Sequence, residues 1–243
     1  MVDGGSDDET VEILKKYDPW IDHWESKEDR GVSHAINKGV NRTTGDIVNW
    51  VNSDDILLPW ALRRVAEGFE TYSQADAIYG HRILIDAESR MQNVWFAPIR
   101  FQMYHLLRGN PLAQECCFWR AELFERVGGL KESLKATMDH DLFARMWEVG
   151  TFVRVSHFLG AFRSHSDGIT SRLSELQQKE LDQIPEVLDI GGTVKEQVLR
   201  SSVFDWIHQV DYRVRQVEAL LRGVATVRRE NGSWIWTPEK IGK

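Results

Sequence analysis

Segments that favour β-strands alternate with segments that favour helices over about the first 170 residues, and this alternation constrains the fold more than any other feature. Runs rich in β-branched and aromatic side chains predict the strands, and apolar residues spaced three and four apart predict the helices. The expected strands are Trp20–Trp24, Ile47–Val51, Ala77–Tyr79, Arg82–Ile85, Asn93–Phe96, Cys116–Trp119, Phe152–Val155 and Leu159–Phe162. The expected helices are Val11–Tyr17, Ser33–Val40, Phe101–Leu107, Ala121–Val127 and Asp139–Val149. A further helix is opened by Pro59 and has the apolar face Leu62, Val65, Ala66 and Phe69. This order of elements predicts an α/β sheet flanked by helices.

One acidic turn, Asn52-Ser53-Asp54-Asp55, directly follows Ile47–Val51, which we expect to be a buried parallel strand. Ligands of α/β sheets bind at the carboxyl ends of the strands. Two adjacent carboxylates repel each other unless a cation lies between them, and Mg²⁺ or Mn²⁺ prefers carboxylate and phosphate oxygens. The turn is therefore a candidate metal and diphosphate site, although capping of the helix opened by Pro59 is the commoner explanation for a bare Asp-Asp pair.

Two further polar residues lie at the ends of expected elements. Asp139 begins a helix, where the helix dipole stabilises its anionic form; this suits a catalytic base and a helix cap equally. His165 follows the last expected strand, and an isolated histidine is more often a surface or packing residue than a ligand. Neither residue identifies a site by itself.

Charge and composition exclude some classes of protein. Lys and Arg number 30 against 37 Asp and Glu, a net charge of −7, which argues against general nucleic-acid binding. The two cysteines, Cys116 and Cys117, are adjacent, so we expect reduced thiols in a cytoplasmic protein. No run of about 20 apolar residues is present to span a bilayer, and the N-terminus lacks the regions of a signal peptide. Peripheral attachment at the inner face of the membrane stays open.

The sequence pattern changes after about Ser171. We expect one domain over residues 1–172 and a helical extension over residues 173–243, with amphipathic helices at Leu173–Leu188 and Val194–Val224. This second helix could pack on the first domain, form a homodimer or lie on a membrane, but interspersed acidic residues argue against anionic lipid. Its apolar stripe is Leu199, Val203, Trp206, Val210, Val214, Val217, Leu221 and Val224.

An ordered series of short motifs runs along the first domain. The motifs are Asp3-Gly4-Gly5-Ser6; Asp29-Arg30-Gly31 with Ala35-Ile36-Asn37-Lys38-Gly39; Thr44-Gly45-Asp46-Ile47-Val48 with Asn52-Ser53-Asp54-Asp55; Gly109-Asn110-Pro111 with Gln114; Glu125-Arg126-Val127-Gly128-Gly129-Leu130; Met138-Asp139-His140-Asp141-Leu142; and Phe162-Arg163-Ser164-His165. Each motif alone is weak, but the ordered series is specific. The series resembles the inverting family-two glycosyltransferases, which have the GT-A fold: a Rossmann-like sheet that binds nucleotide-diphospho-sugars.

The resemblance implies a function and a role for each matching residue. The chain would transfer a sugar from a UDP- or dTDP-linked donor, with inversion and with Mg²⁺ or Mn²⁺, to a hydroxyl of a glycan or lipid-linked acceptor in surface polysaccharide synthesis. Asp139 matches the catalytic base, and Arg145 would support its helix. The substrate-binding positions are Asp3 at the nucleotide base, Arg30 near the nucleotide, Asp54 near the ribose, and Gln114. The metal positions are Asp55 and His165.

The chain departs from the family at its beginning. Members normally start with a strand, a helix and most of a second strand before the turn at Asp3, and Gly4 replaces an aspartate found in many relatives. We therefore expect an N-terminally truncated GT-A domain, arising as a fragment, from a wrong start codon or as a natural short form. Two alternatives to an active glycosyltransferase stay open. One is a catalytically inactive relative that binds a sugar nucleotide or partner protein; the other is a nucleotidyltransferase, although we find no Gly-rich phosphate loop.

Overall fold

The structure is a computed structural model that describes residues 1–98, 112–165, 174–181, 210, 212–219, 225–230 and 233–238. The expected helix at Phe101–Leu107 and the Gly109-Asn110-Pro111 motif lie outside the described residues. Most of the two expected C-terminal helices, residues 182–209, also lies outside them.

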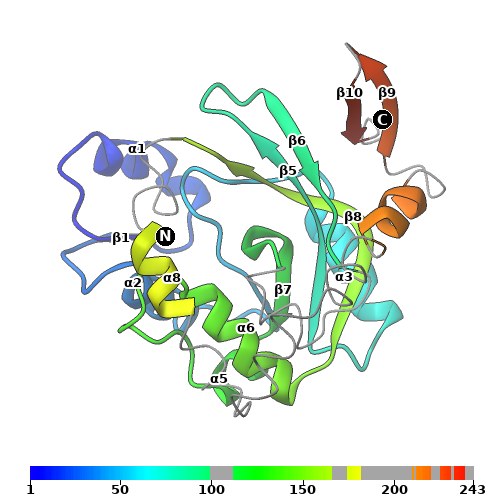
Figure 1. Ribbon diagram of the computed structural model, residues 1–243. Helices are drawn as coiled ribbons and strands as arrows, with labels where there is room; N and C mark the ends of the chain where they lie inside the picture. The colour runs from blue at the N-terminus through cyan, green and yellow to red at the C-terminus, as the bar shows by residue number, and fades with distance from the viewer. Residues whose placement is uncertain are drawn as a thin grey trace.

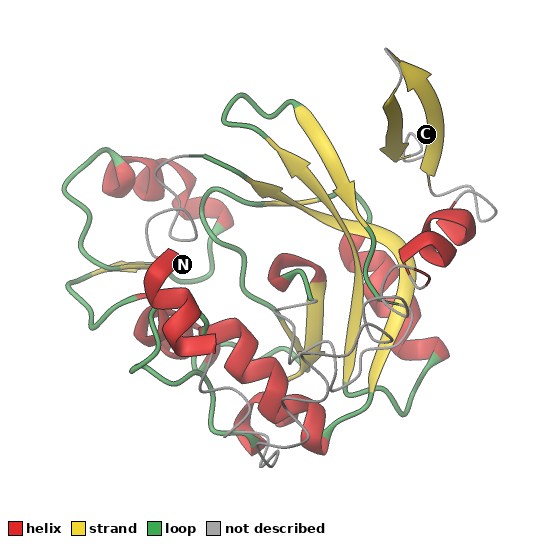
Figure 2. Cartoon of the chain, in the orientation of Figure 1, coloured by secondary structure: helices red, strands yellow, loops and turns green. Residues whose placement is uncertain are grey.

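A six-stranded mixed sheet forms the centre of the described chain (Figures 1 and 2). The strands pair in the order β3-β7-β5-β8-β4, and β6 pairs with β5 off this path. Only β5 and β8 run parallel; every other pair in this sheet is antiparallel. The strands are β3 (Ile47–Val48), β4 (Ile56–Leu57), β5 (Ala77–Ile85), β6 (Met91–Trp95), β7 (Cys117–Arg120) and β8 (Phe152–Arg163). The expected α/β sheet flanked by helices is thus confirmed.

Four expected strands prove to be two long ones. Ala77–Tyr79 and Arg82–Ile85 join through Gly80 and His81 to form β5, and Phe152–Val155 and Leu159–Phe162 join to form β8. The β5–β8 register shifts on either side of His81, so the polar interruption in the sequence is an irregularity in a continuous strand rather than a loop. A Cβ atom on Gly80 would lie 2.6 Å from the His157 carbonyl oxygen, which explains the glycine at this close approach.

Two other strand predictions are wrong. Ile47–Val51 is not a buried parallel strand, because only β3 is extended, and it pairs antiparallel with β7 at the edge of the sheet. Trp20–Trp24 is not a strand: Asp18–Trp20 forms the 3₁₀-helix η1, and Trp24 Nε1 donates to Asp18 Oδ1 at 2.7 Å. The nearest strand is β2 (Glu25–Ser26), which begins directly after Trp24. It pairs in parallel with β1 (Val2–Asp3) in a separate small sheet.

The helices agree with their predicted positions to within about two residues, as boundaries usually do. They are α1 (Thr10–Tyr17), α2 (Val32–Val40), α3 (Ala61–Thr71), α5 (Ala121–Arg126), α6 (Met138–Val149) and α8 (Ser174–Leu181), with the 3₁₀-helix η2 (Gln114–Cys116) before β7. The apolar face expected for α3 is wrong at Leu62, which is 64% exposed, and at Ala66, which is also exposed. Val65 and Phe69 are buried as expected, and Ala61 is buried with them.

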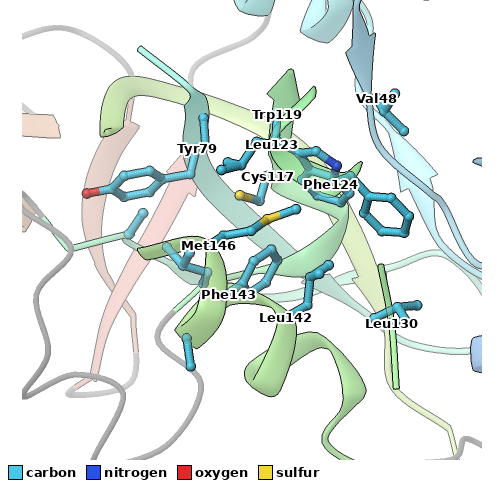
Figure 3. Close-up of a cluster of buried hydrophobic side chains, with 14 residues drawn as sticks. Val48, Tyr79, Cys117, Trp119, Leu123, Phe124, Leu130, Leu142, Phe143 and Met146 are labelled. Carbon is cyan, nitrogen blue, oxygen red and sulfur yellow. The ribbon is translucent and has the colours of Figure 1, made fainter. Parts of the chain in front are cut away.

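The two faces of the sheet carry separate cores because neighbouring side chains along a strand point to opposite faces. From β5, Tyr79 joins a cluster with α5 and α6, whereas Ile78 joins a cluster with α3. Figure 3 shows the first cluster, in which the Trp119 ring lies 6.3 Å from Phe124 and 6.0 Å from Phe143. This core fixes α6, the helix that carries Asp139, against the sheet. Both cysteines are buried and free, as expected.

The described C-terminal residues pack on the same sheet. In the helix of residues 212–219, Arg215 Nη1 donates to the Phe96 carbonyl oxygen at 2.6 Å, and Ala219 joins a buried cluster with Phe96 and Phe158. Three valines of the expected apolar stripe lie in the described residues and face away from this contact: Val210, Val214 and Val217 are 38%, 47% and 54% exposed. A hairpin follows, β9 (Ala225–Glu230) with β10 (Ser233–Pro238), although the sequence pattern had indicated only helices there.

Candidate active site

The Asn52–Asp55 turn connects β3 to β4, and its backbone closes with Asp55 N donating to the Asn52 carbonyl oxygen at 3.1 Å. Because β4 pairs with β8, Asp55 lies beside the end of that long strand. Its Oδ1 accepts the backbone N–H of Arg163 at 3.0 Å, and its Oδ2 accepts from Asn52 Nδ2 at 3.0 Å. The carboxylate is therefore held at both oxygens by neutral donors.

Burial makes Asp55 an unusual acid. The pKa of its carboxyl group is raised to about 6, first because the group is largely removed from water and also because the carboxylates of Glu115 and Asp54 are nearby. The hydrogen bonds from Arg163 N and Asn52 act in the opposite direction but do not compensate. An acid that is costly to ionise, with another acid beside it, is chemically suited to a bound cation.

Asp54 and His165 meet at this turn. His165 Nε2 lies 3.0 Å from Asp54 Oδ2, and both side chains are partly exposed. Arg163 stabilises the arrangement: its Nε donates to the Asp54 carbonyl oxygen at 2.9 Å, and its Nη1 donates to the Asp86 carbonyl oxygen and to Ser89 Oγ, both at 2.9 Å. One guanidinium group thus ties the acidic turn to the β5–β6 turn.

Gln114 lies on the other side of the turn, in η2, and is 6% exposed. Its Nε2 donates to the Trp50 carbonyl oxygen and lies 3.4 Å from Asn49 Oδ1, and its Oε1 accepts weakly from Asn52 Nδ2 at 3.5 Å. Asn52 therefore bridges Gln114 and Asp55. The fold brings Gln114, Asp54, Asp55 and His165 together, four of the seven residues predicted from the sequence.

A buried ion pair between Arg82 and Glu115 lies next to this cluster, and the sequence did not predict it. Arg82 Nε and Nη2 donate to the two carboxylate oxygens of Glu115 at 2.7 and 2.6 Å, and the Glu115 side chain is 1% exposed. Arg82 also lies over the Phe162 ring, 4.7 Å from its centroid. A Cβ atom on Gly160 would lie 2.8 Å from Glu115 Cγ, so β8 can pass over this pair only with glycine there. The adjacency of Glu115 to Gln114 was the only signal in the sequence.

Asp3 lies at the end of β1, in the small sheet. Its carboxylate accepts four hydrogen bonds: Ser26 Oγ and Ser6 Oγ at 2.6 Å, Ser6 N at 3.0 Å and Gly5 N at 3.2 Å. The two serine hydroxyls are the main reason that the pKa of Asp3 is lowered. Asp29 fills the space beside Gly4, where a Cβ atom would lie 2.8 Å from Asp29 Oδ2.

Arg30 precedes α2 and contacts the segment before α6, whereas Asp139 lies in α6 itself. Arg30 makes a bidentate ion pair with Glu132, at 2.8 and 3.0 Å. Asp139 is in the first turn of α6 and accepts the His140 N–H at 2.8 Å. The expected support from Arg145 is present, because its guanidinium binds Asp141 Oδ2 at 2.6 Å and the Gly129 carbonyl oxygen at 2.8 Å.

A cation would need more ligands than these side chains offer. Within the described ranges, no group of three or more His, Cys, Asp or Glu side chains is placed to hold a metal ion. Mg²⁺ and Mn²⁺ commonly use only one or two protein carboxylates and complete their shell with water and phosphate oxygens. Asp55, with Asp54 and His165 beside it, fits such a partial site.

Residues 1–128 match the family model described as "Glycosyl transferase family 2". The chain belongs to this family. A relative among curated proteins is a PGL/p-HBAD biosynthesis glycosyltransferase of Mycobacterium tuberculosis, 26% identical over 198 residues that span 79% of this chain and 73% of the relative. The chondroitin synthase of Escherichia coli is 22% identical over 184 residues, which cover 74% of this chain but 26% of that enzyme.

Solved structures support the same fold for this family 2 glycosyltransferase. Staphylococcus aureus TarS 1–349 in complex with UDP-GlcNAc has a TM-score of 0.62 at 16% identity, over 84% of this chain and 61% of that chain. The mannosyltransferase PcManGT of Pyrobaculum calidifontis, in complex with GDP-Man and Mn²⁺, has a TM-score of 0.51 at 13% identity, over 91% of this chain and 73% of that one. These likenesses confirm the GT-A sheet. None of the described helices of this glycosyltransferase is long and apolar enough to cross a membrane.

Proposed function

We propose that this glycosyltransferase moves a sugar from a nucleotide-diphosphate donor to an acceptor hydroxyl with inversion, assisted by Mg²⁺ or Mn²⁺. The observation that carries the proposal is the half-buried Asp55, whose pKa is raised to about 6, in the Asn52–Asp55 turn that Arg163 secures. A divalent cation with a diphosphate offsets the cost of ionising this acid. When bound there, the metal would stabilise negative charge that develops on the departing diphosphate.

The remaining site residues take the roles that their positions allow. Asp139 would accept the proton of the acceptor hydroxyl as that oxygen attacks the anomeric carbon; the bond from this carbon to the diphosphate breaks, and the diphosphate keeps the electron pair. Asp3 would contact the nucleotide base and Asp54 the ribose. The Arg30 side chain is 68% exposed, so it can exchange Glu132 for a nucleotide phosphate at little cost, since exposed ion pairs contribute little to stability.

The roles of Gln114 and His165 follow from their contacts. Gln114 is almost buried and hydrogen-bonded to the backbone at Trp50, so its contribution to the donor is to hold the Asn52–Asp55 turn in place. His165 is near Asp54 and at the rim of the turn, where its ring could turn to a metal or to the diphosphate. We include it as a metal ligand together with Asp55.

We further propose a UDP- or dTDP-linked donor and a glycan or lipid-linked acceptor, as in surface polysaccharide synthesis. The structural neighbours hold UDP-GlcNAc or GDP-Man, and the relatives include a PGL/p-HBAD biosynthesis glycosyltransferase, a chondroitin synthase and an O-antigen biosynthesis protein. A lipid-linked acceptor would place the reaction at the inner face of a membrane. A homodimer through the C-terminal helices is supported by the exposure of Val210, Val214 and Val217, and a monomer in sedimentation of the full chain would refute it.

A transfer assay tests the catalytic roles. The protein would be incubated with UDP- and dTDP-linked hexoses, Mn²⁺ and glycan or lipid-linked acceptors, and release of the nucleoside diphosphate would be measured. Asp139→Asn should abolish transfer while leaving binding of UDP with Mn²⁺ intact, because it removes only the proton acceptor. Retained turnover would refute the assignment of Asp139 as the base. No turnover by the unaltered protein, with intact nucleotide binding, would favour the alternative of a catalytically inactive relative.

A further inference from the structure

The N-terminus of α6 is held by a residue from a helix far along the chain. Thr137 is the N-cap of α6, yet its side chain makes no capping bond to the helix itself. Its hydroxyl donates instead to Glu180 Oε2 at 2.9 Å. Glu180 belongs to α8, one end of which lies next to an end of α6 in Figure 1. The helix that carries Asp139 therefore takes its capping acceptor from residue 180.

Glu180 binds every backbone N–H of the three residues before α6. Its Oε1 accepts from Lys135 N, and its Oε2 accepts from Ala136 N and Thr137 N, each at 2.9 Å. The side chain is buried, with 6% of the residue exposed. Burial acts to raise its pKa, but the hydrogen bonds from residues 135–137 outweigh this and hold the pKa below its usual value. Glu180 is thus a buried anion whose carboxylate oxygens accept backbone hydrogen bonds at the positive end of a helix.

The segment that Glu180 binds connects two regions of the proposed site. On one side, Lys135 Nζ donates to the Arg30 carbonyl oxygen at 3.0 Å, and Ser33 Oγ donates to the Leu134 carbonyl oxygen at 3.3 Å. On the other side, Asp139 lies two residues beyond Thr137. A shift of this segment would move Asp139 relative to the loop that carries Arg30.

We propose that Glu180 is a positioning residue for Asp139, acting through residues 135–137; this rests on the proposed function. The sequence around Glu180 has no motif in common with the series of the first domain. The sequence pattern places Glu180 in the expected C-terminal extension, residues 173–243. The contact makes α8 part of the catalytic unit. Such positioning matters because a displacement of about 1 Å at a catalytic group can lower the rate about 100-fold.

Glu180→Gln tests the proposal with little change in shape. The amide carries one acceptor oxygen, so its NH₂ group must face at least one of the N–H donors of residues 135–137. We expect turnover, measured as UDP release from UDP-linked hexoses, to fall about 10- to 100-fold. The dissociation constant of UDP with Mn²⁺ should change less than about twofold, since none of the residues assigned to the nucleotide is altered. Amide hydrogen exchange at Lys135, Ala136 and Thr137 should become faster.

Lys179→Ala is the matched control, because this side chain is exposed on the same helix and it should leave turnover and exchange unchanged. If Glu180→Gln fails to fold, Thr137→Val removes only the hydroxyl donor and should lower turnover several-fold. Wild-type turnover in the Glu180 variant would overturn the proposal, and so would an equal loss of turnover and nucleotide affinity. Asp139→Asn in the same assay distinguishes failure of the proposed function from failure of the positioning role. If Asp139→Asn retains transfer, the proposed function fails. If Asp139→Asn is inactive while Glu180→Gln is fully active, only the positioning role of Glu180 is rejected.

Discussion

Asp55→Asn should stabilise the protein at neutral pH and at the same time abolish metal-dependent transfer. The pKa of Asp55 is about 6 in the folded protein against 3.8 for the ordinary group, chiefly through burial. Between these values the folded state binds more protons than the unfolded chain, so the free energy of unfolding falls as pH rises through this window. Asparagine imitates the protonated acid and should remove that loss.

The size of the effect follows from the pKa shift and from the contacts. A shift of about two units at about 1.4 kcal/mol per unit gives an upper limit of about 3 kcal/mol. Asp55 keeps some contact with water, so we take about half of this, ~1.5 kcal/mol. The new amide NH₂ must face either Arg163 N or Asn52 Nδ2, and loss of that hydrogen bond costs about 0.5–1 kcal/mol. The net gain is about 0.5–1 kcal/mol, or about 1–4 °C in Tm for a chain of this length.

Urea unfolding without divalent metal, at about pH 7.5 and about pH 4, would measure this difference. The variant should be the more stable protein at the higher pH, and its advantage should disappear at the lower pH, where Asp55 is protonated in the wild type. Mn²⁺ with UDP should raise the Tm of the wild type but not of the variant. Asp54→Asn is the control: that side chain is 36% exposed and is only a minor cause of the raised pKa of Asp55, so its replacement should stabilise the protein much less. A variant less stable than the wild type at both pH values would refute the reasoning.

Two further substitutions test the surroundings of the site. Gly4→Asp should destabilise the protein by about 1–2 kcal/mol in urea unfolding, because the new side chain meets the Asp29 carboxylate. The double variant Gly4→Asp with Asp29→Gly should recover most of this loss. An equal loss in the single and double variants would contradict this explanation. Glu115→Gln should cost about 3 kcal/mol, since it leaves the charge of Arg82 uncompensated in the interior. Glu132→Gln, at the exposed pair with Arg30, should cost much less, and similar costs of the two substitutions in thermal unfolding would count against a burial effect.

The helices of the first domain were predictable because their signals are local. The apolar spacing and the glycines after α5 and α6 fix those helices within a few positions along the chain. Long-range pairing decided the strands. Gly80-His81 interrupts the apolar pattern, but the backbone continues as β5 because β6 and β8 pair with it on either side. No local signal shows that β3 would keep only two paired residues at the edge of the sheet.

The candidate site shows the same division between local and distant information. The adjacent acids of the turn and their place after an apolar run were visible in the sequence, and so was Asp139 at the start of a helix. The surroundings that set the pKa of Asp55 were not visible, because they depend on burial and on distant segments. Glu115, which raises this pKa, is 60 positions from Asp55 in the sequence, and the backbone N–H of Arg163, which lowers it, is 108 positions away. Ion pairs and caps of this kind, with Glu180 on Thr137 as another example, depend on the completed fold.

The surroundings of Asp55 are easier to explain by function than by stability. A turn selected only to cap a helix would leave its carboxylates in water, where ionisation costs nothing, but Asp55 is half-buried and close to two other acids. Its neighbours supply neutral donors, and the guanidinium of Arg163 binds backbone carbonyl oxygens rather than the Asp55 carboxylate. In the described contacts, the Asp55 carboxylate thus accepts hydrogen bonds from neutral donors only. A divalent cation bound with the donor would offset the cost of ionising this acid, so binding of the donor should stabilise the protein.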